Sequence, residues 1–509
     1  MRRTASASFT VGAIAVALVA AACASASAPS GGAYRPPEQH HQPTQPPPPD
    51  QSAATPYDGV TYEDPGVNPY VDTRRDREST FALDVDTASY GIATRYIADG
   101  NLPDPASVRV EEFVNSFDQG YPAPEDEAFA VIADGGPTPF LDASEQLLRI
   151  GIRARDVARR ERPDASLTFV IDVSGSMARE DRLELVKGAL RLLVDHLRRT
   201  DRVAIVVFGS EARIVLDSTG ADDRDEILGA IDELRPEGST NAEAGLRIGY
   251  ELARENVIEG GINRVVLASD GVANVGLTDA GAILSTIRED AESGIQLVSV
   301  GVGMGNYNDA LLEQLADDGD GFYSYVNDLQ VARKLFVEDL VGTLDTVALD
   351  AKAQVEFDPD AVHAYRLIGF ENRAIADHAF RDDVPAGAIG AGHEVTALYA
   401  LRLTGETFGS DRLGTISLRW TDPESHRQRE IAREIDASDL SRSFAETESH
   451  FKFDAIVAAS AEVFRDSPWI EGYRIDDVVA VADEVSEELP QTDQVHDFLE
   501  LLEHAVELR

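Results

Sequence analysis

Hydrophobic and polar positions between residues 165 and 345 follow two alternating patterns. Continuous apolar runs, typical of strands buried on both faces, occur at 167–171, 203–208, 265–268, 297–300 and 322–325. Between them apolar residues recur every three or four positions, which predicts helices at 183–197, 227–234, 244–252, 283–287, 311–315 and 331–344. A short run at 214–216 predicts an edge strand. This alternation predicts an α/β domain over 165–345, with a doubly wound parallel sheet covered on both faces.

The regions on either side of this domain follow other periods. Apolar residues alternate with polar ones, as in half-buried strands, at 129–132, 147–152, 355–357, 365–368, 394–401 and 414–420. We therefore expect an N-terminal flanking region at 76–164 and a β-rich domain at 346–440, which can form one β-sandwich with the α/β domain inserted. Residues 441–509 have helical periodicity and predict a C-terminal segment of two to four packed helices.

The N-terminus has the features of an export signal. Arg2 and Arg3 precede a short apolar stretch that ends in small residues before Cys23. We interpret residues 1–22 as a signal peptide, because the stretch is too short to span a bilayer comfortably. Residues 23–75 are rich in Pro, Ser, Ala and Gly, a composition that predicts an extended tether that buries no core.

Cys23 is the one cysteine of the chain. The run from Leu18 to Cys23 resembles a bacterial lipobox, which implies that Cys23 carries a lipid. Attachment through this lipid would be the chain's only contact with a membrane, on the cell envelope. Ala24 after the cysteine favours the outer membrane in a cell that has two. The alternative is an ordinary cleavage signal beside an unrelated cysteine.

Charge and composition exclude several other roles. The chain has 509 residues, of which 45 are Lys or Arg and 91 are Asp or Glu, for a net charge of −46. Such a surface repels phosphate, so we expect no nucleic-acid partner. No stretch after the signal reaches 18 apolar residues, so we expect no transmembrane helix. One cysteine allows neither an intrachain disulfide nor a Cys/His zinc cluster.

Oxygen-bearing side chains follow the predicted strands at one edge of the sheet. The first strand leads into Asp172-Val173-Ser174-Gly175-Ser176, the strand at 265–268 leads into Asp270, and Thr240 precedes a predicted helix. In parallel sheets, ligands bind outside the carboxyl ends of the strands. Two carboxylates and three hydroxyls suit a hard cation such as Mg²⁺. Taken singly, these residue types are also ordinary turn and capping residues.

The motif Asp172-x-Ser174-x-Ser176, with Thr240 and Asp270, resembles the metal-ion-dependent adhesion site of von Willebrand factor type A (VWA) domains. The resemblance covers about 165–345. It implies that these five residues hold Mg²⁺, with Mn²⁺ or Ca²⁺ as alternatives. It also implies that an Asp or Glu carboxylate of a protein partner completes the coordination sphere.

The resemblance extends beyond this domain to a family of bacterial VWA lipoproteins. The segments that carry it are 79–90, 102–103, 109–112, 301–309, 365–373 and 391–399. This family implies no enzymatic activity. We therefore expect a lipid-anchored envelope protein that binds a protein ligand through its metal. One alternative is an envelope scaffold whose VWA domain needs no metal.

A second alternative is an enzyme. Residues 81–87 read hhhDxDxT (h, hydrophobic) and resemble the nucleophile motif of haloacid-dehalogenase-type phosphatases, with Asp84 and Asp86 as the reacting carboxylates. Such an enzyme requires an alternating strand and helix pattern after the motif. The sequence lacks this pattern there, so we expect a strand that ends in a capped turn.

Overall fold

The computed structural model describes residues 62–508, except 63, 84–85, 126, 158–162, 271–284, 286, 292, 304–308, 320, 327–328, 334, 337–345, 383–385, 406–408, 410 and 424. The chain divides into two units, residues 1–52 and 53–509, and every described residue lies in the second. The expected signal peptide, Cys23 and most of the expected tether lie outside the described residues.

A six-stranded sheet forms the centre of the region that begins at residue 165. Its strands are, in spatial order, β10 (Tyr323–Val326), β9 (Ile295–Val302), β8 (Ile262–Ser269), β5 (Ala165–Asp172), β6 (Arg202–Phe208) and β7 (Ala212–Gly220). All neighbours pair in parallel except β6 and β7, which are antiparallel. The predicted α/β class is confirmed, and the edge strand expected at 214–216 is the antiparallel β7.

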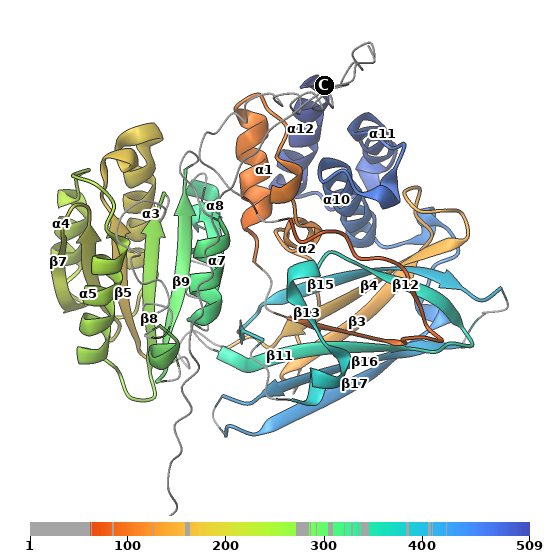
Figure 1. The fold of residues 1–509 in the computed structure, drawn as a ribbon, viewed down its shortest axis with the longest axis horizontal. Coiled ribbons are helices and arrows are strands. Elements are labelled where there is room, and N and C mark those ends of the chain that lie inside the picture. Colours follow the sequence, from red (N-terminus) through yellow and green to blue (C-terminus); the bar gives the residue numbers. More distant parts are fainter. Residues whose placement is uncertain are drawn as a thin grey trace, which may run out of the picture. The chain divides into compact units, whose positions relative to one another are not determined.

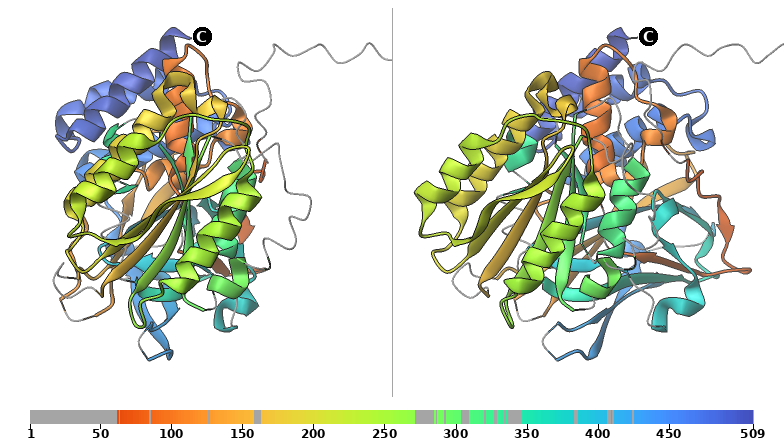
Figure 2. Two further views of the ribbon diagram at one scale, coloured as in Figure 1. Left: turned by 90° about the vertical axis from the view of Figure 1, so that its left-hand side faces the viewer. Right: turned by 60° about the vertical axis from the view of Figure 1, so that its left-hand side comes forward.

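Helices cover both faces of this sheet (Figure 1, Figure 2). One face buries apolar residues of α3 (Arg182–His196), α4 (Arg224–Glu233) and α8 (Leu329–Arg333). The other face buries those of α5 (Ala242–Glu255) and α7 (Asp309–Asp318). These helices follow the predicted apolar spacing. The helix expected at 283–287 and the second half of the one at 331–344 lie largely outside the described residues.

Two antiparallel sheets form a β-sandwich (Figure 1). The first is ordered β1 (Val71–Asp72), β12 (Val362–Ile368), β15 (Glu394–Leu403), β4 (Glu145–Ala154), β3 (Phe129–Gly136). The second is ordered β13 (Ala374–Ile375), β2 (Glu78–Ala82), β11 (Thr346–Phe357), β16 (Arg412–Thr421), β17 (Gln428–Asp436), and β14 (Ala388–Gly390) pairs with β11. Leu148 and Ile150 of the first sheet share one core with Val355 and Ile416 of the second. Both flanks thus contribute strands, as expected. Strand β1 lies within residues 23–75, so the end of the segment expected as a tether is part of the sandwich.

The C-terminal segment folds into helices α10 (Ser449–Phe464), α11 (Ile475–Val485) and α12 (Asp493–Glu507). They share a core with α1 (Ala88–Ala98) and α2 (Val110–Val114), through residues such as Phe113, Phe453 and Phe498. These three helices lie within the two to four that the sequence predicted for the C-terminal segment, but the contribution of α1 and α2 was not predicted. The described residues also form short 3-10 turns, η1 (Pro105–Ser107), η2 (Gly175–Asp181), η4 (Glu371–Arg373), η5 (Asp377–Arg381), η6 (Ala437–Asp439), η7 (Phe444–Glu446), η8 (Pro468–Ile470) and η9 (Ser486–Glu488).

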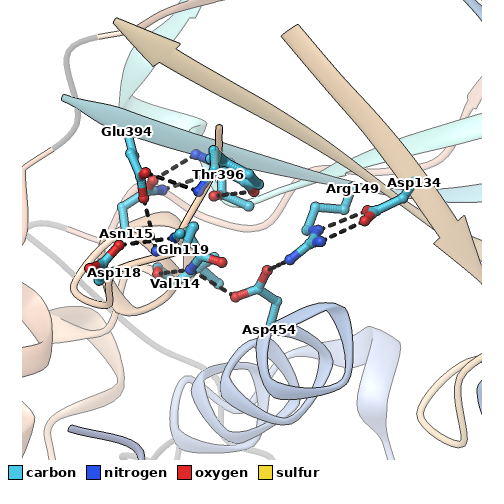
Figure 3. Close-up of polar contacts among 11 residues, drawn as sticks. Val114, Asn115, Asp118, Gln119, Asp134, Arg149, Glu394, Thr396 and Asp454 are labelled. Carbon is cyan, nitrogen blue, oxygen red and sulfur yellow. Dashed lines mark hydrogen bonds and ion pairs between the residues drawn. The ribbon is translucent and has the colours of Figure 1, made fainter. Parts of the chain in front are cut away.

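A buried polar cluster joins α10 to the sandwich (Figure 3). Arg149 of β4 donates to both oxygens of Asp134 on β3, at 2.8 and 2.5 Å, and to Asp454 of α10 at 2.9 Å. Gln119, which follows α2, donates to the other oxygen of Asp454 at 2.9 Å. Because a buried charge is costly without partners, these contacts make the docking of α10 specific. Within the described ranges, no helix has the length and apolarity needed to cross a membrane.

Candidate functional site

The first candidate residue, Asp172, ends the central strand β5. Every residue of β5 is buried, and Asp172 is 0 % exposed. As the chain leaves the sheet, the Val173 N–H donates to the carbonyl of Phe208 at 2.9 Å. The Ser174 N–H then donates to Asp172 Oδ1 at 2.7 Å. The backbone therefore holds the carboxylate in place at the carboxyl edge of the sheet.

The backbone N–H of Ser174 and the hydroxyls of Ser174 and Ser176 connect Asp172 to the second carboxylate. Ser176 lies in η2, and its Oγ is 2.9 Å from the Oγ of Ser174. The Ser176 hydroxyl also donates to Asp270 Oδ1 at 2.9 Å. Asp270 directly follows β8, which pairs in parallel with β5. The parallel pairing therefore places both carboxylates at the same sheet edge, as the sequence predicted.

The fifth predicted residue, Thr240, lies in the loop that leads into α5. Backbone hydrogen bonds hold this loop against the first one: Gly175 N–H donates to the carbonyl of Gly238 at 3.0 Å, and Glu237 N–H donates to that of Val173. Thr240 is half-buried. Its loop thus lies against the segment that carries Ser174 and Ser176.

Sequence reasoning missed two residues that contact this site. The Ser269 hydroxyl donates to Asp172 Oδ2 at 2.7 Å, so both oxygens of Asp172 accept a hydrogen bond. The Arg182 guanidinium, at the start of α3, donates to Asp270 Oδ2 at 2.7 Å. The position of Ser269, on the last residue of a buried strand and next to Asp270, was the available signal. The sequence held no comparable signal for Arg182.

Burial controls the electrostatics of Asp172. Removal from water raises the pKa of its carboxyl to about 6, although hydrogen bonds from Ser269 and Ser174 oppose the rise. A cation that replaces the lost water as a partner would favour the ionised form.

The donor chemistry of the site fits a divalent cation of the Mg²⁺ type. The five predicted residues offer only oxygen, from two carboxylates and three hydroxyls, and Mg²⁺ prefers oxygen ligands. Across the described part of the chain, no group of three or more His, Cys, Asp and Glu side chains is placed to hold a metal. This candidate site has two carboxylates, and hydroxyls supply its other donors.

The residues of the phosphatase alternative have a different setting. Asp84 lies outside the described residues. Asp86 is buried, accepts a hydrogen bond from Tyr323 N–H at 2.9 Å, and pairs with Arg373. Its carboxylate therefore bonds to β10 and to the residue at the end of η4.

Three family models match the chain. The model described as von Willebrand factor type A domain matches residues 166–338, and the one described as von Willebrand factor matches 57–149. The model described as Uncharacterized protein YfbK, C-terminal, matches 342–412 and 404–508. VWA domains commonly mediate protein–protein interaction, and none of these descriptions names an enzyme.

The chain also matches individual proteins and solved structures. The chain is 36% identical to Uncharacterized protein YfbK of Escherichia coli (strain K12) over 86% of this chain and 80% of that protein. It is 27% identical to Uncharacterized protein sll0103 of Synechocystis sp. over 57% of this chain and 68% of that protein. Among solved structures, von Willebrand factor type A from Catenulispora acidiphila aligns with a TM-score of 0.43 and 16% identity, over 73% of this chain and 89% of that one.

Proposed function

Because the chain belongs to the family of YfbK and related bacterial VWA-domain proteins, we propose that it is a divalent-metal-dependent protein-binding module of the cell envelope. Asp172, Ser174, Ser176, Thr240 and Asp270 would hold Mg²⁺, with Mn²⁺ or Ca²⁺ as alternatives. The partner would supply an Asp or Glu carboxylate to the metal.

One observation carries this proposal. Asp172, Ser174, Ser176 and Asp270 come from two strand ends, and the short polar contacts described above join them into one oxygen-lined group. When bound, the metal would supply a concentrated positive charge to which a partner carboxylate can bind. The chain's own residues position the oxygens and shield Asp172 from water.

The proposed location depends on the N-terminal sequence. A lipid on Cys23 would anchor the chain, with the outer membrane as its place in a cell that has two membranes. The Pro-rich residues that follow would hold the folded part away from the bilayer. Fractionation of cells that express the wild type or Cys23→Ser tests the anchor. An unchanged membrane fraction for the variant would reject it.

Calorimetric titration of the full chain with Mg²⁺ and Mn²⁺ tests the metal site. We expect one site in the wild type and its loss in Asp172→Asn, which preserves the shape of the side chain. Asp201→Asn is the matched control, because Asp201 is also 0 % exposed and bonds to the opposite end of β5, through Ala165 N–H at 3.0 Å. Equal metal binding by all three proteins would place the bound metal on the acidic surface and favour the scaffold alternative.

A further inference from the structure

Arg182 occupies a buried position beside the candidate metal site. Its guanidinium donates to Asp270 Oδ2 at 2.7 Å, and the two side chains are 4% and 3% exposed. The other oxygen of Asp270 accepts from Ser176. One carboxylate therefore bonds on one side to a candidate metal ligand and on the other to a fixed cation.

The fold leaves room for this cation at the end of β9. Gly303 follows β9 with a φ of +72°. A Cβ at this position would overlap the side chain of Arg182. Glycine is suited both to this backbone conformation and to the close approach of the guanidinium. The position of Arg182 thus depends on α3, on β9 and on the Asp270 carboxylate together.

The consequence of Arg182 lies in the charge of the site. The formal charges of the Asp172 and Asp270 carboxylates and of the Arg182 guanidinium sum to −1, and a divalent metal brings the sum to +1. Without Arg182 the loaded site would be neutral. In a buried setting, the difference between a positive and a neutral site has a large effect on the attraction of an anion, because charges there interact through a low dielectric.

We propose that Arg182 is a positioning residue that keeps the metal-loaded site positive, so that the site selects an anionic ligand, a carboxylate, over a neutral oxygen donor. This inference rests on the proposed metal site. The chain has a net charge of −46, which repels an acidic partner at long range. A local positive charge is then needed to hold that partner.

The first test uses the unmodified full chain. Mn²⁺ is titrated calorimetrically in the presence of acetate, of acetamide, or of neither. We expect acetate to raise the Mn²⁺ affinity about tenfold, which corresponds to about 1.4 kcal/mol, and acetamide to leave it unchanged. Mn²⁺ binding that depends on Asp172 but is the same in acetate and acetamide would overturn the inference and leave the proposed metal site intact.

Variants then assign the effect to Arg182. We expect Arg182→Gln to bind Mn²⁺ alone about tenfold more tightly and to lose the response to acetate. Arg182→Lys should retain the response, because it keeps the charge. Arg254→Gln is the matched control: it breaks another arginine–aspartate pair of the same domain, with Asp290 at 2.6 Å, and should behave as wild type.

The outcomes separate the two proposals. A response to acetate that survives in Arg182→Gln overturns the role of Arg182. If Arg182→Gln does not fold, as judged by circular dichroism, the inference is tested by the response of the wild type and of Arg182→Lys to acetate. A preference for acetate in both supports the inference, and its absence from either overturns it. Mn²⁺ binding that persists in Asp172→Asn rejects the metal site itself.

Discussion

At the scale of single residues, the candidate site depends on how a buried carboxylate is satisfied. Asp172 has no contact with solvent, and each of its oxygens accepts a hydrogen bond, one from Ser174 N–H and one from the Ser269 hydroxyl. A buried acceptor that loses its donor keeps the full cost of its desolvation. Ser269 therefore contributes to stability as well as to the geometry of the site.

Removal of this hydroxyl should be measurably destabilising. We expect Ser269→Ala to lower the free energy of unfolding by about 1–3 kcal/mol in urea denaturation, because Asp172 Oδ2 loses a donor. Ser299→Ala is the matched control. Ser299 lies on the adjacent β9, is also 0 % exposed, and its hydroxyl has no hydrogen-bond partner among the described residues. Similar losses in both variants would show that the bond to Asp172 adds nothing.

The predictability of the site differs among its residues for a physical reason. Asp172, Ser174, Ser176 and Asp270 could be predicted because each follows a strongly apolar run, and parallel pairing then brings the strand ends together. Arg182 could not be predicted in this way. An arginine at the start of an amphipathic helix is ordinary, and its contact with Asp270 depends on the packing of α3 against the end of β9.

At the scale of elements, α5 is packed unusually closely against the sheet. Gly245 lies on its buried face, and a Cβ there would be 2.6 Å from Cδ1 of Phe208 on β6. The carbonyl of Phe208 accepts the Val173 N–H, directly after Asp172. The spacing between α5 and β6 therefore influences the loop that begins the candidate metal site.

A methyl group at Gly245 should disturb this spacing. We expect Gly245→Ala to lower the free energy of unfolding by about 1–3 kcal/mol through overpacking, and to weaken Mn²⁺ binding in calorimetric titration. Gly229→Ala on α4 makes the same change where nothing lies within 4 Å. It should raise stability by up to about 1 kcal/mol, because alanine favours the helix. A gain in stability for both variants would contradict this account of α5.

The same scale shows why parts of the fold escaped prediction. Strands β5, β6, β8 and β9 are buried on both faces, so their apolar runs were visible. Strand β17 has eight of nine residues exposed or half-buried and reads QREIAREID, a pattern that competes with a charged helix or loop. It is a strand because it pairs along its length with β16, a tertiary contact that local sequence does not encode.

At the scale of the whole described chain, residues far apart in sequence share cores on both sides of the inserted VWA domain. Nearly all of α10 is buried, since it packs against α2 and the sandwich as well as against α11. Arg149–Asp454, Arg366–Glu462 and Arg465–Glu371 are buried ion pairs between α10, or the residue that follows it, and the sandwich or η4. Deletion of either flank would leave such charges unpaired, which is strongly destabilising.

The cluster around Asp454 gives the described chain a specific dependence on pH. Burial raises the pKa of Asp454 to about 6, although Arg149 and Gln119 oppose the rise. In the unfolded chain the pKa is lower, near 3.9. The folded state therefore binds the proton more tightly, and the stability that this provides is complete below about pH 4 and lost as pH rises through about 6. The loss is on the order of 3 kcal/mol, at about 1.4 kcal/mol for each pKa unit.

Comparison with Asp454→Asn isolates this contribution from all other titrating groups. The asparagine keeps an acceptor for Gln119 but has no carboxyl to titrate. We expect the stability of the wild type relative to this variant, from urea unfolding, to fall by about 2 kcal/mol between pH 4 and pH 7, because the unfolded carboxyl is already half ionised at pH 4. Asp483→Asn removes the same charge from an exposed position of α11 and controls for net charge. Parallel pH profiles for wild type and Asp454→Asn would show that the pKa of Asp454 is the same in the folded and unfolded chain, and that its pairing with Arg149 balances the cost of burial.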